Sequence, residues 1–303
     1  MTLKSSAVVL LAAAVIWLSL QATLLFRVDG LLATYDLPAH QHLAAIQSRH
    51  PAALWDNDWY AGHPTYSYPP LAHMFAASLM ERFGFDIGFK MAVAAVYMMS
   101  VPAVYAAARA VAGFPPAVAA AATLAVVLSP SLFRAFLFGQ YPSLAAFALF
   151  WGVLAVLFAL LRAPRPDVRL GLLGILSLGL LGSVHLLPLL LLPAIVAPLP
   201  LLFPTGRLIR RLVPVALVGG CLALLPSLAL IIDRGQFAKT PVPHITRTME
   251  MVHPEGMLDW VVAPAGLPMV LGLLAVTPHL VGARRGVWRS NIIRNTRPAF
   301  CSG

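Results

Sequence analysis

The chain has 303 residues, of which 60% are hydrophobic and only 11% are charged, and its mean hydropathy is +0.83. Soluble globular domains carry about 25% charged residues, so this composition excludes an ordinary soluble protein. Apolar runs of about 20 residues recur along the chain, whereas the short segments of alternating polarity that indicate an outer-membrane barrel are absent. The sequence therefore predicts an all-α fold, a polytopic transmembrane helical bundle.

Eight spans are predicted, at 6–26, 89–108, 115–130, 143–161, 170–186, 188–204, 212–232 and 261–281. The first follows Lys4 and lacks a small-residue cleavage site, so we expect an uncleaved helix rather than a signal peptide. The apolar stretch 71–83 is too short to cross a hydrocarbon core of about 30 Å. We expect it to lie at the membrane interface or to re-enter.

The basic residues set the orientation. With a cytoplasmic N-terminus, the positive-inside rule is satisfied by clusters at Arg109, Arg162/Arg165/Arg169, Arg207/Arg210/Arg211 and Arg284/Arg285. Both termini are then cytoplasmic, and the net charge of +10 reflects orientation and anionic lipid rather than nucleic acid. Residues 1–285 form one transmembrane domain with outer loops 27–70, 131–142 and 233–260. The basic tail 286–303 lacks apolar periodicity, and we expect disorder or a chain cut short.

The long first outer loop holds the strongest candidate for chemistry, Asp36, with His40 four residues later. Two interpretations of Asp36 stay open. If Pro38 lies in the first turn of a helix, Asp36 falls at its N-cap, where a carboxylate is favoured by free N–H groups. Alternatively, Asp36 is a general base or a metal ligand, with His40 on the same helix face.

An aromatic block follows at 55–70, with acids and a histidine between its rings. Its candidate substrate-binding residues are Trp55, Asp56, Asp58, Trp59, His63 and Tyr66. An aromatic belt at the level of the lipid headgroups explains the rings equally well. Rings with interspersed carboxylates also suit a sugar, whose C–H faces pack on the rings while its hydroxyls bond to the acids.

Further candidates lie beyond the first loop. Arg134, near Gln140 and Tyr141, could hold a phosphate in two hydrogen bonds, and snorkelling to lipid headgroups is the alternative. His185 is a lone ionisable residue near the outer end of a predicted span. Such residues are candidates for function, although a hydrogen bond between helices accounts for them equally well.

Several of these motifs resemble the GT-C superfamily of polytopic glycosyltransferases. They are Asp36-x3-His40, Trp55-x3-Trp59-x2-Gly62-x-Pro64, Tyr68-Pro69-Pro70-Leu71, the run 134–142 and Ser183-Val184-His185-Leu186. More narrowly, the chain resembles bacterial and archaeal membrane proteins labelled "6-pyruvoyl-tetrahydropterin synthase-related". The resemblance covers residues 6–200 and implies a prokaryotic plasma membrane. The three-histidine zinc site of true pterin synthases is not reproduced in the sequence.

The GT-C resemblance implies transfer of a sugar from a polyprenyl-phosphate donor to a lipid, glycan or protein at the outer membrane face. Asp36 matches the acid that activates the acceptor or helps to hold a divalent cation, Mg or Mn. The second acidic motif of the family has no counterpart in 131–142, which leaves the cation open. A non-catalytic or truncated membrane assembly partner and a lipid flippase or transporter are the alternatives. Ion-coupled transporters bury carboxylates within their spans, and the predicted spans contain no Asp or Glu.

Overall fold

The computed structural model describes residues 3–27, 34, 36–50, 55–56, 63–64, 69–185 and 187–228, all within the unit Met1–Val242. The chain begins with α1 (Leu3–Ala22), the 3-10 turn η1 (Thr23–Phe26), α2 (Leu37–Arg49), β1 (Trp55–Asp56), β2 (His63–Pro64), α3 (Leu71–Phe83), α4 (Phe85–Met98) and α5 (Ser100–Ala110). It continues with α6 (Pro116–Val127), α7 (Pro130–Leu137), α8 (Tyr141–Arg162), α9 (Val168–Val184), α10 (Leu187–Val196), η3 (Leu199–Leu201), α11 (Thr205–Leu224) and η4 (Leu225–Ser227).

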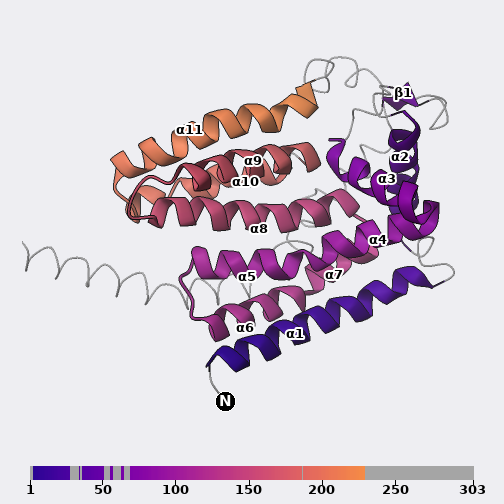
Figure 1. Ribbon diagram of the computed structural model, residues 1–303, viewed down its shortest axis with the longest axis horizontal. Coiled ribbons are helices and arrows are strands. Elements are labelled where there is room, and N and C mark those ends of the chain that lie inside the picture. Colours follow the sequence, from indigo (N-terminus) through magenta and orange to yellow (C-terminus); the bar gives the residue numbers. More distant parts are fainter. Residues whose placement is uncertain are drawn as a thin grey trace, which may run out of the picture. The chain divides into compact units, whose positions relative to one another are not determined.

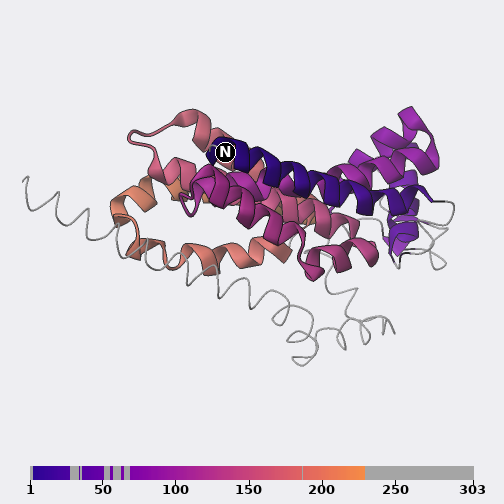
Figure 2. The same cartoon turned by 90° about the horizontal axis from the view of Figure 1, so that it is seen from below.

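Most of the helices run side by side, and α2 and α3 lie at one end of the bundle. Figure 1 shows α1, α6, α5, α8, α9 and α11 alongside one another, with α2, α3 and β1 together beyond the start of α8. Figure 2 shows the same bundle turned by 90° about the horizontal axis. Helix α8 packs against α5 and α9, α9 packs against α11, and α6 packs against α1 and α5. In the part of the chain described here the fold is helical, apart from the two-residue pair β1–β2.

Three helices are long and apolar enough to cross a membrane: Ser6–Phe26, Phe85–Ala110 and Tyr141–Arg162. They match the spans predicted at 6–26, 89–108 and 143–161. The pair α6–α7 would make a fourth span, although it bends by 45°. Within the described ranges the candidate spans thus number three or four, and the total of eight stays a prediction. The predicted span at 261–281 lies outside these ranges.

Proline and glycine explain where the predicted helices break. Ser129 is extended, its hydroxyl accepts a hydrogen bond from the Leu132 N–H at 3.4 Å, and Pro130 follows in the first turn of α7. This is a new helix start, so residues 131–137 of the expected second outer loop are helical. Gly84, with φ at 89°, separates α3 from α4. The stretch 71–83 is therefore a helix of its own, as expected for a segment too short to span.

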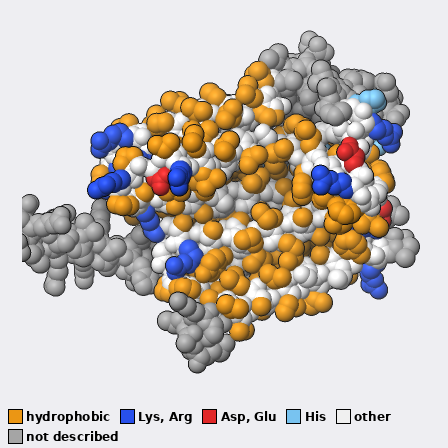
Figure 3. All heavy atoms as spheres, viewed as in Figure 1, with side chains coloured by type: hydrophobic (Ala, Val, Ile, Leu, Met, Phe, Trp, Pro, Cys, Tyr) orange, Lys and Arg blue, Asp and Glu red, His pale blue; other side chains and the backbone are white. Residues whose placement is uncertain are grey.

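Many large hydrophobic side chains lie on the outside of the bundle. Hydrophobic side chains cover the face seen in Figure 3, and large ones such as Ile16, Leu20, Leu176 and Leu217 are exposed. Exposing such a surface to water would cost free energy, whereas lipid tails are themselves apolar and can contact it favourably. The candidate spans and this surface together indicate a membrane protein.

Arginine side chains join α5, α8 and α11 through hydrogen bonds at one end of the bundle. The C-terminal carbonyls of a helix lack partners within that helix, and cationic side chains stabilise them. Arg211 on α11 donates to the carbonyl oxygens of Leu160 at 2.6 Å, Leu161 at 3.3 Å and Ala163 at 2.7 Å, at the end of α8. Arg162 donates to the Val111 carbonyl after α5 at 2.7 Å. Some of the basic residues therefore join neighbouring helices through direct hydrogen bonds.

Replacing Arg211 with methionine is expected to destabilise the bundle by about 2 kcal/mol, because the end of α8 loses its charged donor. The matched control is Arg210→Met, since exposed Arg210 bonds within its own helix to the Gly206 carbonyl. Thermal unfolding of the detergent-solubilised protein measures both changes. Equal melting temperatures for the two variants would show that Arg211 does not hold α11 on α8.

Candidate functional site

The candidate site lies where α2, α3, α7 and the first turn of α8 meet. Helix α8 runs from Tyr141 at this end to Arg162 at the basic end. Its 22 residues separate the two ends by about 33 Å, at 1.5 Å of rise per residue. The described part of the predicted first outer loop and the arginine contacts therefore occupy opposite ends of the bundle.

Asp36 stands at the N-cap position of α2, with Pro38 in the first turn as expected. Its side chain makes no capping hydrogen bond, and its backbone N–H donates to the Phe138 carbonyl at 3.0 Å. The residue is half-buried, and burial raises the pKa of its carboxyl. The capping interpretation thus fits the position of Asp36 but not the contacts of its carboxylate.

The start of α2 packs against the turn at Phe138–Gly139. Gly139 has a φ of 74°, a conformation that glycine adopts at no steric cost. A Cβ atom there would lie 2.6 Å from the Leu37 nitrogen and 2.9 Å from Leu37 Cγ. Only glycine allows this approach, and it brings two segments far apart in sequence, 36–40 and 134–142, into contact.

A buried pair of histidines links α2 to α3. His40 Nδ1 lies 3.1 Å from His73 Nε2, and the two residues are 5% and 1% exposed. Between two imidazole nitrogens one must donate and the other accept, so the nitrogen that accepts carries no proton. Burial, followed by the charge of His185, lowers the pKa of His40 to about 4. Burial, followed by His40, lowers the pKa of His73 to about 3, so both rings are neutral at pH 7.

Tyr141 closes the cluster from the start of α8. Its hydroxyl donates to the Ala72 carbonyl on α3 at 2.8 Å. Its ring centre lies 6.3 Å from those of both His40 and His73, and 5.6 Å from that of Phe89 on α4. The three polar rings come from three helices and are all buried. They therefore fix the positions of α2, α3 and α8 relative to one another.

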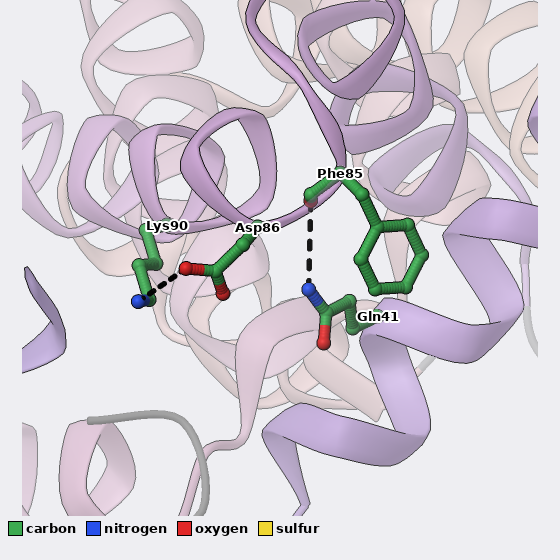
Figure 4. Close-up of polar contacts among 4 residues, drawn as sticks. All are labelled: Gln41, Phe85, Asp86 and Lys90. Atoms are coloured by element: carbon green, nitrogen blue, oxygen red, sulfur yellow. Dashed lines mark hydrogen bonds and ion pairs between the residues drawn. The ribbon is translucent and has the colours of Figure 1, made fainter. Parts of the chain in front are cut away.

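Polar contacts also hold α2 against α3 and α4. Ser48 donates to the Glu81 carboxylate at 3.1 Å, and the Gln41 amide donates to the Phe85 carbonyl at 3.4 Å. Figure 4 shows the second contact beside the ion pair of Asp86 and Lys90 within α4. Helix α2 is thus attached along its length rather than only at the histidine pair.

The structure brings together some of the residues predicted from the sequence. Asp36, His40 and Tyr141 lie in the segments described above, and exposed Gln140 stands at the start of α8. Arg134 is exposed on α7, where its carbonyl accepts from the Phe138 N–H at 2.8 Å. His185 caps the end of α9, and its effect on the pKa of His40 places its charge near the cluster.

The aromatic block is described only in part. The backbones of Trp55 and Asp56 pair antiparallel with Pro64 and His63. Their side chains lie outside the described part of the chain, as do Asp58, Trp59 and Tyr66. Among the residues that are described, no three of His, Cys, Asp and Glu gather in a way that holds a metal ion. The divalent cation stays a prediction, because the side chains of Asp56 and Asp58 lie outside the described part of the chain.

His73 is the residue of the cluster that the sequence did not single out. It lies in Leu71-Ala72-His73-Met74-Phe75, an apolar run expected to lie at the interface. An ionisable side chain within so apolar a helix was the available signal, because burying it without a partner is costly. Its partner, His40, is distant in sequence, so only the fold reveals the pair.

The resemblance to glycosyltransferases is carried by motifs alone. No protein-family model matches the chain, and no curated protein matches it in sequence.

Proposed function

We propose that the protein is a GT-C-like glycosyltransferase of a prokaryotic plasma membrane. It takes a sugar from a polyprenyl-phosphate donor and passes it to a lipid, glycan or protein acceptor. Its termini are cytoplasmic, its eight spans include the three candidate spans described above, and the end of the bundle that holds α2 and α3 faces outward. Arginines at the opposite end agree with this orientation.

One observation carries the proposal. The two segments that resemble the family in separate outer loops are in contact, through the hydrogen bond from Asp36 N–H to the Phe138 carbonyl and the close approach of Gly139 to Leu37. Contact between these segments is what a single site built from both loops requires. The half-buried Asp36 carboxylate, which makes no capping bond, lies at their junction.

Asp36 acts as the general base in this proposal. Its carboxylate takes the proton of the acceptor hydroxyl, and the hydroxyl oxygen bonds to the anomeric carbon of the sugar. The bond from that carbon to the phosphate oxygen breaks, and polyprenyl phosphate leaves with the electron pair. A raised pKa makes Asp36 a stronger base than an exposed carboxylate. No step of this proposal is assigned to a metal.

Around this base, Arg134 and Gln140 are placed to meet the carrier phosphate. Both side chains are exposed on the segment that Asp36 contacts. A guanidinium binds phosphate oxygens in two parallel hydrogen bonds. The aromatic block that contains Trp55, Trp59 and Tyr66 supplies the surface for the sugar rings in this proposal.

Replacing Asp36 with asparagine is expected to lower sugar transfer by about 100-fold or more, because general-base catalysis contributes on that scale. The measurement is transfer of labelled sugar in membrane vesicles, normalised to the amount of protein. The matched control is Asp86→Asn, which removes a carboxylate at the same end of the bundle but breaks only the ion pair with Lys90. Equal loss in both variants, or full activity of Asp36→Asn, would contradict the assignment of Asp36.

A further inference from the structure

The histidine pair constrains which nitrogen of His40 can act. His40 uses Nδ1 to contact His73 Nε2 at 3.1 Å. In a neutral imidazole the two nitrogens have opposite roles, one a donor and one an acceptor. If His40 Nδ1 donates in this bond, Nε2 of the neutral ring carries no proton. If Nδ1 accepts, Nε2 carries the proton. A second residue that fixes Nδ1 thereby fixes the chemistry available at Nε2.

We propose that His73 is a positioning residue for His40, whose ring it holds in one tautomer, with Nε2 as the nitrogen that acts in the site. The part of this proposal that concerns sugar transfer rests on the proposed function. The part that concerns the tautomer of His40 stands on the pair itself. No contact between His73 and substrate is needed, because His73 is 1% exposed and acts through His40.

The surroundings of the pair favour this role over simple packing. The ring of Tyr141 lies beside both histidines, and Tyr141 in turn contacts the Phe89 ring on α4 and the Ala72 carbonyl on α3. In such a place two apolar side chains would fill the space without the cost of burying two imidazoles. The ionisable groups around the pair are Asp36 one turn earlier on α2, Tyr141 on α8 and His185 at the end of α9.

The link to the proposed base is short. The His40 backbone N–H donates to the Asp36 carbonyl at 3.1 Å, in the first turn of α2. His40 therefore lies in the same helical turn as Asp36, the proposed base. Replacing His73 with phenylalanine removes the hydrogen-bond partner at similar volume, whereas His73→Gln keeps a side-chain donor and acceptor.

The direct test is nitrogen NMR of the full chain labelled with ¹⁵N-histidine and reconstituted in lipid. His40→Gln assigns the His40 signals, and His50→Gln, a change at an exposed residue, is the control. We expect one neutral tautomer for His40 at about pH 6, where an unperturbed histidine is partly charged. His73→Phe should give a tautomer mixture, and His73→Gln should restore a single tautomer. A mixture in the wild-type chain, or an unchanged spectrum in His73→Phe, would overturn the proposal.

Activity supplies the second readout. In His73→Phe we expect transfer to fall about tenfold with a shifted pH profile, and His73→Gln to recover most of it, because a structural role alone would not move the profile. If phenylalanine and glutamine variants lose activity equally with unchanged profiles, His73 does not act through His40. If no variant transfers sugar, including wild type, while the NMR result holds, the proposed function fails and the positioning of His40 stands.

Discussion

Gly139→Ala is expected to destabilise the protein by about 3 kcal/mol and to reduce sugar transfer strongly. A left-handed conformation costs a residue with a Cβ about 1–2 kcal/mol, and overpacking adds about 1–3 kcal/mol. The added Cβ would meet the Leu37 nitrogen at 2.6 Å and the Asp36 nitrogen at 3.1 Å. The turn must then move away from α2, which separates the two segments of the proposed site.

Gly113 provides a closely matched control for this experiment. It has a φ of 68° against 74° for Gly139, but a Cβ there meets only the Arg162 guanidinium, at 3.4 Å. Gly113→Ala therefore carries the conformational cost without the clash and lies at the other end of the bundle. Thermal unfolding and sugar transfer are measured for both variants. If they lose the same stability and retain the same activity, the docking of α2 on Gly139 does not matter for the site.

The second large effect is on the pH dependence of stability. His40 and His73 have lower pKa values in the folded state, about 4 and 3, than the ordinary value of 6.5. Below about pH 6.5 the unfolded chain therefore binds more protons than the folded one, and stability falls as the pH falls. By about pH 5 each histidine costs about 2 kcal/mol relative to high pH. The raised pKa of Asp36 acts in the opposite sense, because its folded state takes up a proton first.

Unfolding temperatures at about pH 7 and pH 5 measure this effect in detergent or lipid. The wild-type chain should lose stability over this interval, and His73→Gln should lose less because it has one histidine fewer to protonate. His50→Gln, which changes an exposed histidine, should keep the wild-type slope. An equal slope in wild type and His73→Gln would mean that His73 is already charged in the folded protein or is not buried.

The sequence predicted best what depends on local composition. Long uninterrupted apolar runs indicated 6–26, 89–108 and 143–161, and the structure has candidate spans over the same stretches. The prediction was less good where proline interrupts such a run. Pro130, the last residue of the predicted span 115–130, begins a new helix, and Pro193 lies inside α10, which has only 10 residues.

Individual residues of the candidate site could be predicted from the sequence, but the contacts between them could not. Asp-x3-His with Pro38 was enough to predict the start of α2, because a helix start depends on neighbouring residues. The docking of that start on Gly139 joins distant parts of the chain, so no local pattern reveals it. The same holds for His73, which lies in an apolar helix and pairs with His40 across the α2–α3 contact. Motif resemblance named both segments but did not show that they touch.

The alternatives predict different products from the same reconstituted protein. A flippase moves the labelled lipid across the bilayer without breaking it, and an assembly partner leaves it untouched. A glycosyltransferase cleaves the bond between sugar and phosphate. The three classes can therefore be separated by the chemical state of the donor lipid after incubation.

The most direct test is to reconstitute the purified full chain in liposomes with polyprenyl-phosphate-linked sugars and a membrane extract as the source of acceptor. Mass spectrometry then follows free polyprenyl phosphate and the glycosylated product. We predict that both form in equal amounts with the wild-type chain, and that both fall by about 100-fold or more with Asp36→Asn. Intact donor throughout, or cleavage that persists in Asp36→Asn, would contradict a transferase site built on Asp36.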